Sequence, residues 1–137
     1  MHEWALAEGV MRTALQVKDQ EGLKNITAIR IRVGELQQID LEVFEFGLKA
    51  LFQTRPECFK NTTIEFEKEE AMLTCRVCGK SWAYRDTLSH LDRETSESIH
   101  FLPETVHVYV RCPECQSPDF EITKGRSLWI EWIRGEK

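Results

Sequence analysis

Long hydrophobic runs are absent from this 137-residue sequence. No apolar stretch approaches the ~18 residues that a membrane-spanning helix needs. The first residues also lack the basic segment and apolar core of a secretion signal. We therefore expect a cytoplasmic protein that has no membrane partner.

Positive charge is scarce as well. The chain has 18 lysines and arginines against 23 aspartates and glutamates, which gives a formal net charge of -5. Proteins that bind nucleic acid usually carry a basic patch or stripe, and none is visible here. Nucleic acid is therefore not an expected partner.

Signatures of catalysis are missing too. The sequence contains no G-x-x-x-x-G-K-[ST] phosphate loop and no nucleophile and base at a recognisable spacing. We therefore expect a protein that is not an enzyme. Its 42% hydrophobic and 30% charged residues are typical of a globular protein. The length suffices for one domain with a full core, or for a small core plus a metal-stabilised module.

Two amphipathic helices are predicted in the first half of the chain. The first covers residues 4–17, where apolar residues recur at steps of three and four, and Gly22 ends it. The second begins after Asp40, a good N-cap residue, and ends before Pro56. Its apolar residues are Val43, Phe44, Leu48, Leu51 and Phe52.

Three strands are predicted to accompany these helices. Residues 26–34 alternate buried Ile29, Ile31 and Val33 with solvent-exposed arginines, and residues 62–67 also alternate. The apolar residues 127–133 predict a third, buried strand. The predicted fold class is α/β, with two helices on a small β-sheet formed by residues 1–70 with 126–137.

Residues 71–125 show no helical periodicity and contain both C-x-x-C pairs of the chain, with turn-forming glycines and prolines around them. They are interpreted as a separate, zinc-ribbon-like domain with four cysteine ligands. The polar stretch 84–104 is interpreted as a connection inside it.

The two C-x-x-C pairs predict one shared metal site. Two intervening residues let a tight turn direct both sulfurs at one ion, Gly79 follows where a positive φ is needed, and Pro113 restricts the second turn. The expected ligands are Cys75, Cys78, Cys112 and Cys115. The fifth cysteine, Cys58, is interpreted as a small apolar residue beside a helix end.

The cysteines leave the metal and the function open. Zinc held by four thiolates has no open position and is structural, whereas iron in the same ligand set is typical of rubredoxin-like electron carriers. A zinc-ribbon adaptor that binds nucleic acid is a further alternative. However, residues 72–100 hold four basic and four acidic side chains and show no basic stripe.

The sequence opens with Met1-His2-Glu3. An α-amine, a backbone amide nitrogen and an imidazole are three nitrogen donors in a compact chelate, which suits Ni(II) or Cu(II) better than Zn(II). Taken alone, a histidine at the second position is more often a solvated end residue.

A family resemblance changes this interpretation. Met1-His2-Glu3 before a helix with Ala7-Glu8-Gly9, Val33-Gly34-Glu35-Leu36 after a strand, two C-x-x-C pairs and Lys124-Gly125-Arg126 before a final strand resemble the HypA family of nickel metallochaperones. The resemblance spans nearly the whole chain. It implies a nickel domain plus a zinc domain, and a carrier that delivers nickel for maturation of [NiFe] hydrogenase, or in some organisms urease.

The resemblance also implies partners and ligands. The expected partners are the nickel GTPase HypB and the large subunit of a [NiFe] hydrogenase. His2 is the implied principal nickel ligand, with the Met1 amine and the Glu3 backbone nitrogen as co-ligands, and the four cysteines are the implied zinc ligands.

The 33 residues between the cysteine pairs resemble the longer interval of archaeal family members and carry three histidines. His107 lies in an alternating segment, 106–110, predicted to be a strand in which it is a partly exposed structural residue. His90 is predicted to be solvated. His100 lies between apolar residues and is the candidate for a further nickel ligand, supplied when the two domains close, although a structural role is an equal alternative.

Overall fold

The computed structural model describes residues 3–37, 39–102 and 105–137. The chain divides into two compact units. We call the first the N-terminal unit, formed by Met1–Arg32, Ile39–Glu67 and Trp129–Lys137. The second, which we call the four-cysteine unit, consists of Val33–Gln38 and Lys68–Leu128.

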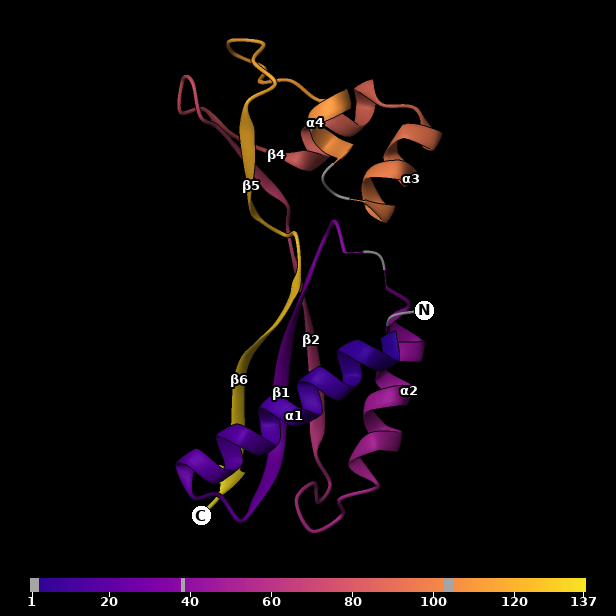
Figure 1. Ribbon diagram of the computed structural model, residues 1–137, viewed down its shortest axis with the longest axis vertical. Coiled ribbons are helices and arrows are strands. Elements are labelled where there is room, and N and C mark those ends of the chain that lie inside the picture. Colours follow the sequence, from indigo (N-terminus) through magenta and orange to yellow (C-terminus); the bar gives the residue numbers. More distant parts are fainter. Residues whose placement is uncertain (1–2, 38, 103–104) are drawn as a thin grey trace. The chain divides into compact units, whose positions relative to one another are not determined.

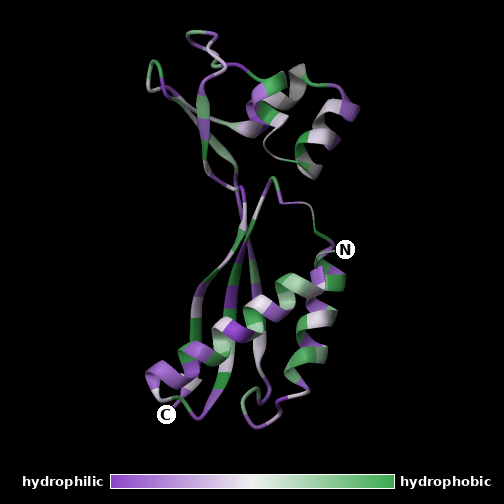
Figure 2. Ribbon diagram, viewed as in Figure 1, coloured by the Kyte–Doolittle hydropathy of each residue, from purple (hydrophilic) through white to green (hydrophobic). Residues whose placement is uncertain are grey.

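Two helices pack against each other in the N-terminal unit, α1 (Glu3–Glu21) and α2 (Leu41–Phe52). The predicted helix pattern is confirmed, because Ala7, Val10 and Ala14 of α1 are buried on one face. Gly22, with φ of +68°, follows the end of α1. Figure 2 shows hydrophobic residues along α2, whose buried face joins this core.

Three strands form the accompanying sheet, in the order β2-β1-β6. Their bounds are Asn25–Gly34 for β1, Thr63–Glu69 for β2 and Leu128–Glu136 for β6. Figure 1 shows α1 crossing one face of these strands. Ile29 and Ile31 of the central strand are fully buried, as the alternation predicts.

The arginines of β1 are not simply exposed to water as expected. Arg30 makes ion pairs with Glu65, Glu67 and Glu131, and Arg32 also pairs with Glu131. The polar side of the central strand is therefore covered by a network of charges contributed by all three strands.

The prediction that residues 127–133 form a buried strand is wrong about burial. Strand β6 exists, but none of its residues is buried. It lies at an edge of the sheet, where one side has no neighbouring strand. Trp129 is 44% exposed, and Trp132 lies under the guanidinium of Arg134 at 4.1 Å.

The four-cysteine unit contains a second, antiparallel sheet of order β4-β3-β5. Its strands are β3 (Met72–Cys75), β4 (Ser81–Ala83) and β5 (Phe120–Lys124). Leu73 at the centre is opposite Trp82 on one side and Ile122 on the other. The hydrophobic core of this unit contains Leu36, buried side chains of this sheet, and buried residues of the segment between β4 and β5, among them Val110.

Residues 84–104 are not a plain connection, and the predicted lack of helices in this region is wrong. The segment contains a 3-10 helix, η1 (Tyr84–His90), and an α-helix, α3 (Arg93–Phe101). Asp92 caps α3 by accepting a hydrogen bond of 2.7 Å from the Thr95 N–H. Ile99 of α3 is fully buried in the core of the four-cysteine unit.

The strand predicted at residues 106–110 is wrong as well. The segment forms the short helix α4 (Val106–Tyr109), in which the Val110 N–H donates to the Val106 carbonyl at 2.9 Å. Val106 and Val110 are both buried, whereas Val108 is 70% exposed. Because the core needs two residues four positions apart, helical spacing prevails over the β preference of valine.

Two motifs that carried the family resemblance meet inside the four-cysteine unit. The Gly34 N–H donates to the Ser127 carbonyl (3.0 Å), and the Leu36 N–H donates to the Gly125 carbonyl (2.9 Å). The Gly125 N–H in turn donates to the Glu69 carboxylate at 2.9 Å. A side chain at Gly34 would collide with the Gly125 backbone, which explains why glycine occupies this crossing.

Candidate metal centre

The two C-x-x-C turns are built in the same way. The Cys75 N–H donates to the carbonyl of Lys80 (2.8 Å), and the Gly79 N–H donates to the carbonyl of Cys75 (3.1 Å). Gly79 has a φ of +79°, which confirms the positive φ predicted for this position. The turn therefore leaves strand β3 at Cys75 and leads back to strand β4, and the N–H groups of Val77 and Cys78 point at the Cys75 sulfur.

The second turn repeats this pattern of hydrogen bonds. The Cys112 N–H donates to the Ser117 carbonyl (3.0 Å), and the Gln116 N–H donates to the Cys112 carbonyl (2.9 Å). Gln116 takes the place of Gly79 and has a φ of +65°. This residue was missed from the sequence, although its position directly after Cys115 corresponds to that of Gly79 after Cys78.

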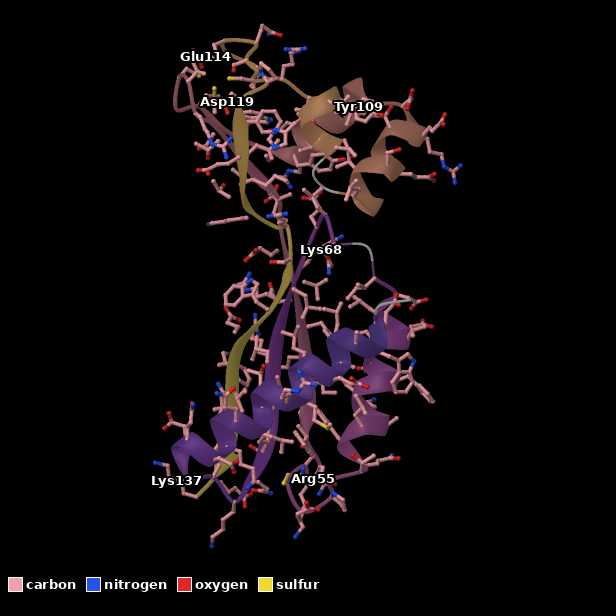
Figure 3. The ribbon with its side chains drawn as sticks, in the orientation of Figure 1. Arg55, Lys68, Tyr109, Glu114, Asp119 and Lys137 are labelled. Atoms are coloured by element: carbon pink, nitrogen blue, oxygen red, sulfur yellow. The ribbon has the colours of Figure 1, made fainter. Side chains whose placement is uncertain are left out.

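The four predicted cysteines come together. Their Sγ atoms all lie within 4.8 Å of one another. The contacts from Cys75 to Cys115 and from Cys78 to Cys112 both measure 3.6 Å, too long for a disulfide, and all four are free thiols. In Figure 3 sulfur atoms lie close to the labelled Glu114 and Asp119, at the end of the four-cysteine unit.

The sulfur positions fit a tetrahedral ion. Metal–sulfur bonds of about 2.3 Å around a tetrahedral zinc place the sulfurs ~3.8 Å apart. The two contacts of 3.6 Å are close to this value, and all four sulfurs lie within 4.8 Å of one another. Cys75 and Cys112 are buried, while Cys78 and Cys115 are exposed. The four-cysteine cluster is therefore a site that can hold one metal ion.

Backbone N–H groups favour the thiolate form at the two buried cysteines. The pKa of the Cys75 thiol is lowered to about 7, mainly by the Cys78 N–H and further by the Val77 N–H. Burial opposes ionisation of Cys112, but the N–H groups of Cys115 and Glu114 outweigh it and lower the pKa of that thiol. The Lys80 N–H lowers the pKa of Cys78, but burial and the hydrogen bonds with the other thiols raise it to about 12, and the pKa of Cys115 is raised as well. Metal binding needs deprotonated sulfur, so the two buried cysteines are the ones that the turns prepare for a cation.

The predicted nickel residues are only partly visible. Met1 and His2 lie outside the described residues. Glu3 is the first residue of α1 and is 8% exposed, and its carboxylate accepts a hydrogen bond of 3.0 Å from the Asp40 N–H. The carboxylate therefore fixes the start of α1 to the residue that caps α2.

The three histidines of the four-cysteine unit lie in helical elements. The backbone of His90 ends η1 and that of His100 lies in α3, while their side chains lie outside the described part of the chain. His107 belongs to α4, is partly exposed and stacks on Phe120 with ring centroids 4.5 Å apart. Its Nδ1 lies 3.4 Å from the Pro118 carbonyl, which is consistent with a structural role.

Cys58 lies apart from the cluster, in the N-terminal unit. It is 3% exposed and follows the end of α2, as predicted. The Sγ atom is 3.8 Å from the Arg55 guanidinium and 3.7 Å from the Glu57 carboxylate.

The fold and the cluster define a class, that of mixed α/β proteins with a metal site of four cysteines. Comparison with known proteins narrows it. The family model described as "Hydrogenase/urease nickel incorporation, metallochaperone, hypA" matches residues 1–135. The chain belongs to the HypA family, as the resemblance of its motifs indicated.

Curated relatives support this assignment over the full length. Proteins named hydrogenase maturation factor HypA from Pyrococcus abyssi and Thermococcus onnurineus are 44% and 43% identical over 137 residues, covering 100% of this chain and 97% of each relative. The solution structure of the Ni metallochaperone HypA from Helicobacter pylori matches with a TM-score of 0.67 at 15% identity, covering 99% of this chain and 98% of that one, which shows a shared fold.

None of the helices in the described ranges combines the length and the apolar character that crossing a membrane requires.

Proposed function

We propose that this chain is a non-enzymatic carrier that delivers nickel for the maturation of a [NiFe] hydrogenase. The observation that carries the proposal is the family match over residues 1–135, which includes the N-terminal motif and both cysteine pairs. The relatives at more than 40% identity are named hydrogenase maturation factors.

The proposed nickel site consists of the Met1 amine, the His2 imidazole and the Glu3 backbone nitrogen. Glu3 opens helix α1, and the first N–H groups of an α-helix have no acceptor within the helix. If the Glu3 amide loses its proton to bind a metal, no hydrogen bond within the helix is broken. The Asp40 N–H holds the Glu3 carboxylate in place, so the segment that carries His2 starts from a fixed point.

The proposed occupant of the four-cysteine cluster is structural zinc. The ligand set is closed, because four sulfurs fill all four positions of a tetrahedral ion. Cys75 and Cys112 also belong to the core of the unit, so the ion joins two turns that the sequence separates by more than thirty residues. Its work is to hold the unit folded rather than to react.

The proposed partners are the nickel GTPase HypB and the hydrogenase large subunit. Since the sequence has no phosphate loop, a partner must supply any nucleotide-driven step of nickel transfer. The four free thiols suit a reducing compartment, which supports the cytoplasm as the place of action.

A further nickel ligand is proposed at His100. A ligand from the four-cysteine unit makes nickel retention depend on the position of that unit, so a partner that shifts the unit triggers release without chemistry by this protein. Ile99, the neighbour of His100 in α3, is fully buried and anchors the helix in the four-cysteine unit.

Isothermal titration of untagged protein with nickel, beside elemental analysis, tests the proposal. We expect nickel binding to wild type with one zinc per chain, and loss of high-affinity binding in His2→Ala or after a tag is joined to Met1. Affinity should fall as the pH drops below neutral, because nitrogen ligands must be deprotonated. His107→Ala, which removes the stacking on Phe120 and the contact with the Pro118 carbonyl, is the matched control.

Equal nickel affinity in wild type and His2→Ala would overturn the nickel assignment. Visible absorption from tightly bound iron would overturn the zinc assignment, because zinc is colourless. His100 is tested separately by comparing the nickel affinity and X-ray absorption spectrum of wild type, His100→Ala and His90→Ala, alone and with the GTPase. If His100→Ala changes neither quantity in either state, that residue is structural.

A further inference from the structure

A cleft of about 750 Å³ lies within the four-cysteine unit beside the two cysteine turns. Residues that follow the first turn form one part of it, including Lys80 and Trp82. The segment around the second turn forms another part, including Tyr109, Arg111 and Pro113. No residue of the proposed nickel site or of the four-cysteine cluster belongs to this lining.

Two of the lining residues are cations without an ionic partner in the described part of the chain. Lys80 and Arg111 are both exposed and make no ion pair there, although the whole chain is acidic with a net charge of -5. In the same unit Arg76, Arg85 and Arg93 are each paired with a carboxylate. The cleft therefore presents unpaired positive charge on a negatively charged protein.

Asp86 is the one acidic residue among those described as lining the cleft. It makes no ion pair with Lys80 or Arg111. The two cations therefore outnumber the one acidic side chain of the cleft. A ligand carboxylate is attracted to Lys80 and Arg111 and repelled only next to Asp86.

A buried donor adds a second, independent observation. Trp82 is 5% exposed, and its indole N–H is buried and lacks a hydrogen-bond acceptor among the described residues. The indole N–H is a donor only, and buried donors nearly always have a partner. Trp82 lines the cleft, so an occupant that carries carbonyl oxygens, as a peptide backbone does, can provide an acceptor if the ring moves enough to expose this N–H.

The remaining lining is mixed, with polar Ser81, Thr87 and Gln116 beside an apolar part. Leu91, Val110 and Pro113 line the cleft, together with Tyr109, which is 47% exposed on α4 (Figure 3). The adjacent Val108 is 70% exposed. Because Tyr109 lines the cleft and is still 47% exposed, an occupant longer than a small metabolite covers it better.

We propose that this cleft binds an acidic peptide segment of a partner protein, with carboxylates on Lys80 and Arg111 and an apolar side chain against Tyr109 and Pro113. Arginine and carboxylate can form two parallel hydrogen bonds, which fixes the direction of the segment. This mode of binding uses charge for orientation and a buried apolar residue for affinity. It does not depend on nickel binding.

A library of random peptides displayed on phage tests the proposal with full-length, zinc-loaded protein. Selection is expected to enrich peptides that combine Asp or Glu with an aromatic or aliphatic residue. Peptides that also bind the double variant Lys80→Glu/Arg111→Glu are removed by counter-selection. If that variant loses its zinc, the double variant Lys80→Gln/Arg111→Gln replaces it in this step. Lys68→Glu/Lys124→Glu, which reverses two exposed lysines outside the cleft lining, is the matched control.

The selected peptide is then titrated into isotopically labelled protein and followed by NMR. The Trp82 indole signal and the amides of the cleft are expected to shift, with at least tenfold weaker binding in the cleft variant and unchanged binding in the control variant. The proposal is overturned by a failure to enrich acidic peptides, by shifts located elsewhere, or by equal binding in the cleft variant. If citrate reproduces the same shifts at the same concentration, the cleft is a site for small anions and the peptide proposal is wrong.

Discussion

The Glu3 carboxylate accepts a hydrogen bond of 3.0 Å from the backbone N–H of Asp40. Asp40 in turn accepts hydrogen bonds from the N–H groups of Glu42 and Val43, and thereby caps helix α2. The starts of the two helices are therefore joined through one capping residue. Glu3, which forms this joint, is also the last residue of the segment proposed to bind nickel.

We expect Glu3→Ala to weaken nickel binding by ~10-fold, which is the lower range for residues that orient metal ligands without binding the metal. The backbone nitrogen remains, but the start of α1 loses its fixed position. Glu3→Gln keeps an acceptor oxygen for the Asp40 N–H and should retain most of the affinity. Calorimetry with nickel measures both, and wild-type affinity in Glu3→Ala would contradict the positioning role.

The cap itself gives a separate prediction. Asp40→Ala removes the acceptor for two N–H groups of α2 and should lower the free energy of unfolding by ~1 kcal/mol. Asp40→Asn retains a capping oxygen and should cost much less. Urea denaturation compares the two, and equal losses would mean that the carboxylate does not act as a cap.

The four-cysteine cluster predicts an all-or-none loss of one metal ion. Replacing any of the four ligands by serine should release zinc and unfold the four-cysteine unit, because binding and folding are coupled in small metal modules. Cys58→Ser is the matched control, since Cys58 is a free thiol outside the cluster. Elemental analysis should find one zinc per chain in wild type and in Cys58→Ser. Full zinc content in Cys75→Ser would exclude the four-thiolate site.

Local patterns explain which features the sequence could predict. The helices and strands of the N-terminal unit follow from periodicity and from one cap, Asp40, which are properties of neighbouring residues. Both cysteine turns are equally local, because their hydrogen bonds close within five residues. The meeting of the four cysteines was therefore predictable, except that the pairing of the two turns had to be assumed.

Features that depend on distant contacts were missed. The helix at Val106 forms because that residue and Val110 both enter one core, which the alternation of valines concealed. Leu36 is fully buried in the core of the four-cysteine unit, so residues 33–38 group with that unit rather than with their neighbours in sequence. Whether 1–70 with 126–137 and 71–125 behave as independent domains stays a prediction.

The charge network on the sheet predicts a pH-dependent stability. The hydrogen bond from Arg32 is the largest cause that lowers the pKa of the Glu131 carboxyl, and the hydrogen bond from Arg30 adds to it. Burial has the opposite, smaller effect. Because the folded-state pKa lies below the ordinary value of 4.5, the ionised carboxylate stabilises the fold above about pH 4.5. That stabilisation is lost as the pH falls through the folded-state pKa.

We therefore expect Glu131→Gln to lower the free energy of unfolding at pH 6 to 7, and the difference from wild type to shrink below pH 4.5. Glu136→Gln, an exposed substitution on the same strand, should show a small difference that does not change with pH. Denaturation curves over this pH range measure both differences. A Glu131→Gln difference that stays constant down to pH 3 would show that its ion pairs do not stabilise the fold.

The close contact between the segments of Gly34 and Gly125 gives the sharpest prediction about the fold. Gly125 has a φ of +81°, and a Cβ there would lie 2.6 Å from the Ala71 backbone nitrogen. Gly125→Ala therefore adds backbone strain and a collision with main-chain atoms that cannot move as a flexible side chain can. We expect a loss of roughly 3 kcal/mol or more in the free energy of unfolding.

Gly22→Ala is the control for this prediction, because Gly22 also has a positive φ, +68°, but has no atom within 4 Å of an added Cβ. It should cost only the ~1 kcal/mol of a left-handed backbone. The difference between the two variants isolates the close approach of Gly125 to Ala71. If both variants lose the same stability in urea denaturation, the approach of these two segments does not constrain residue 125.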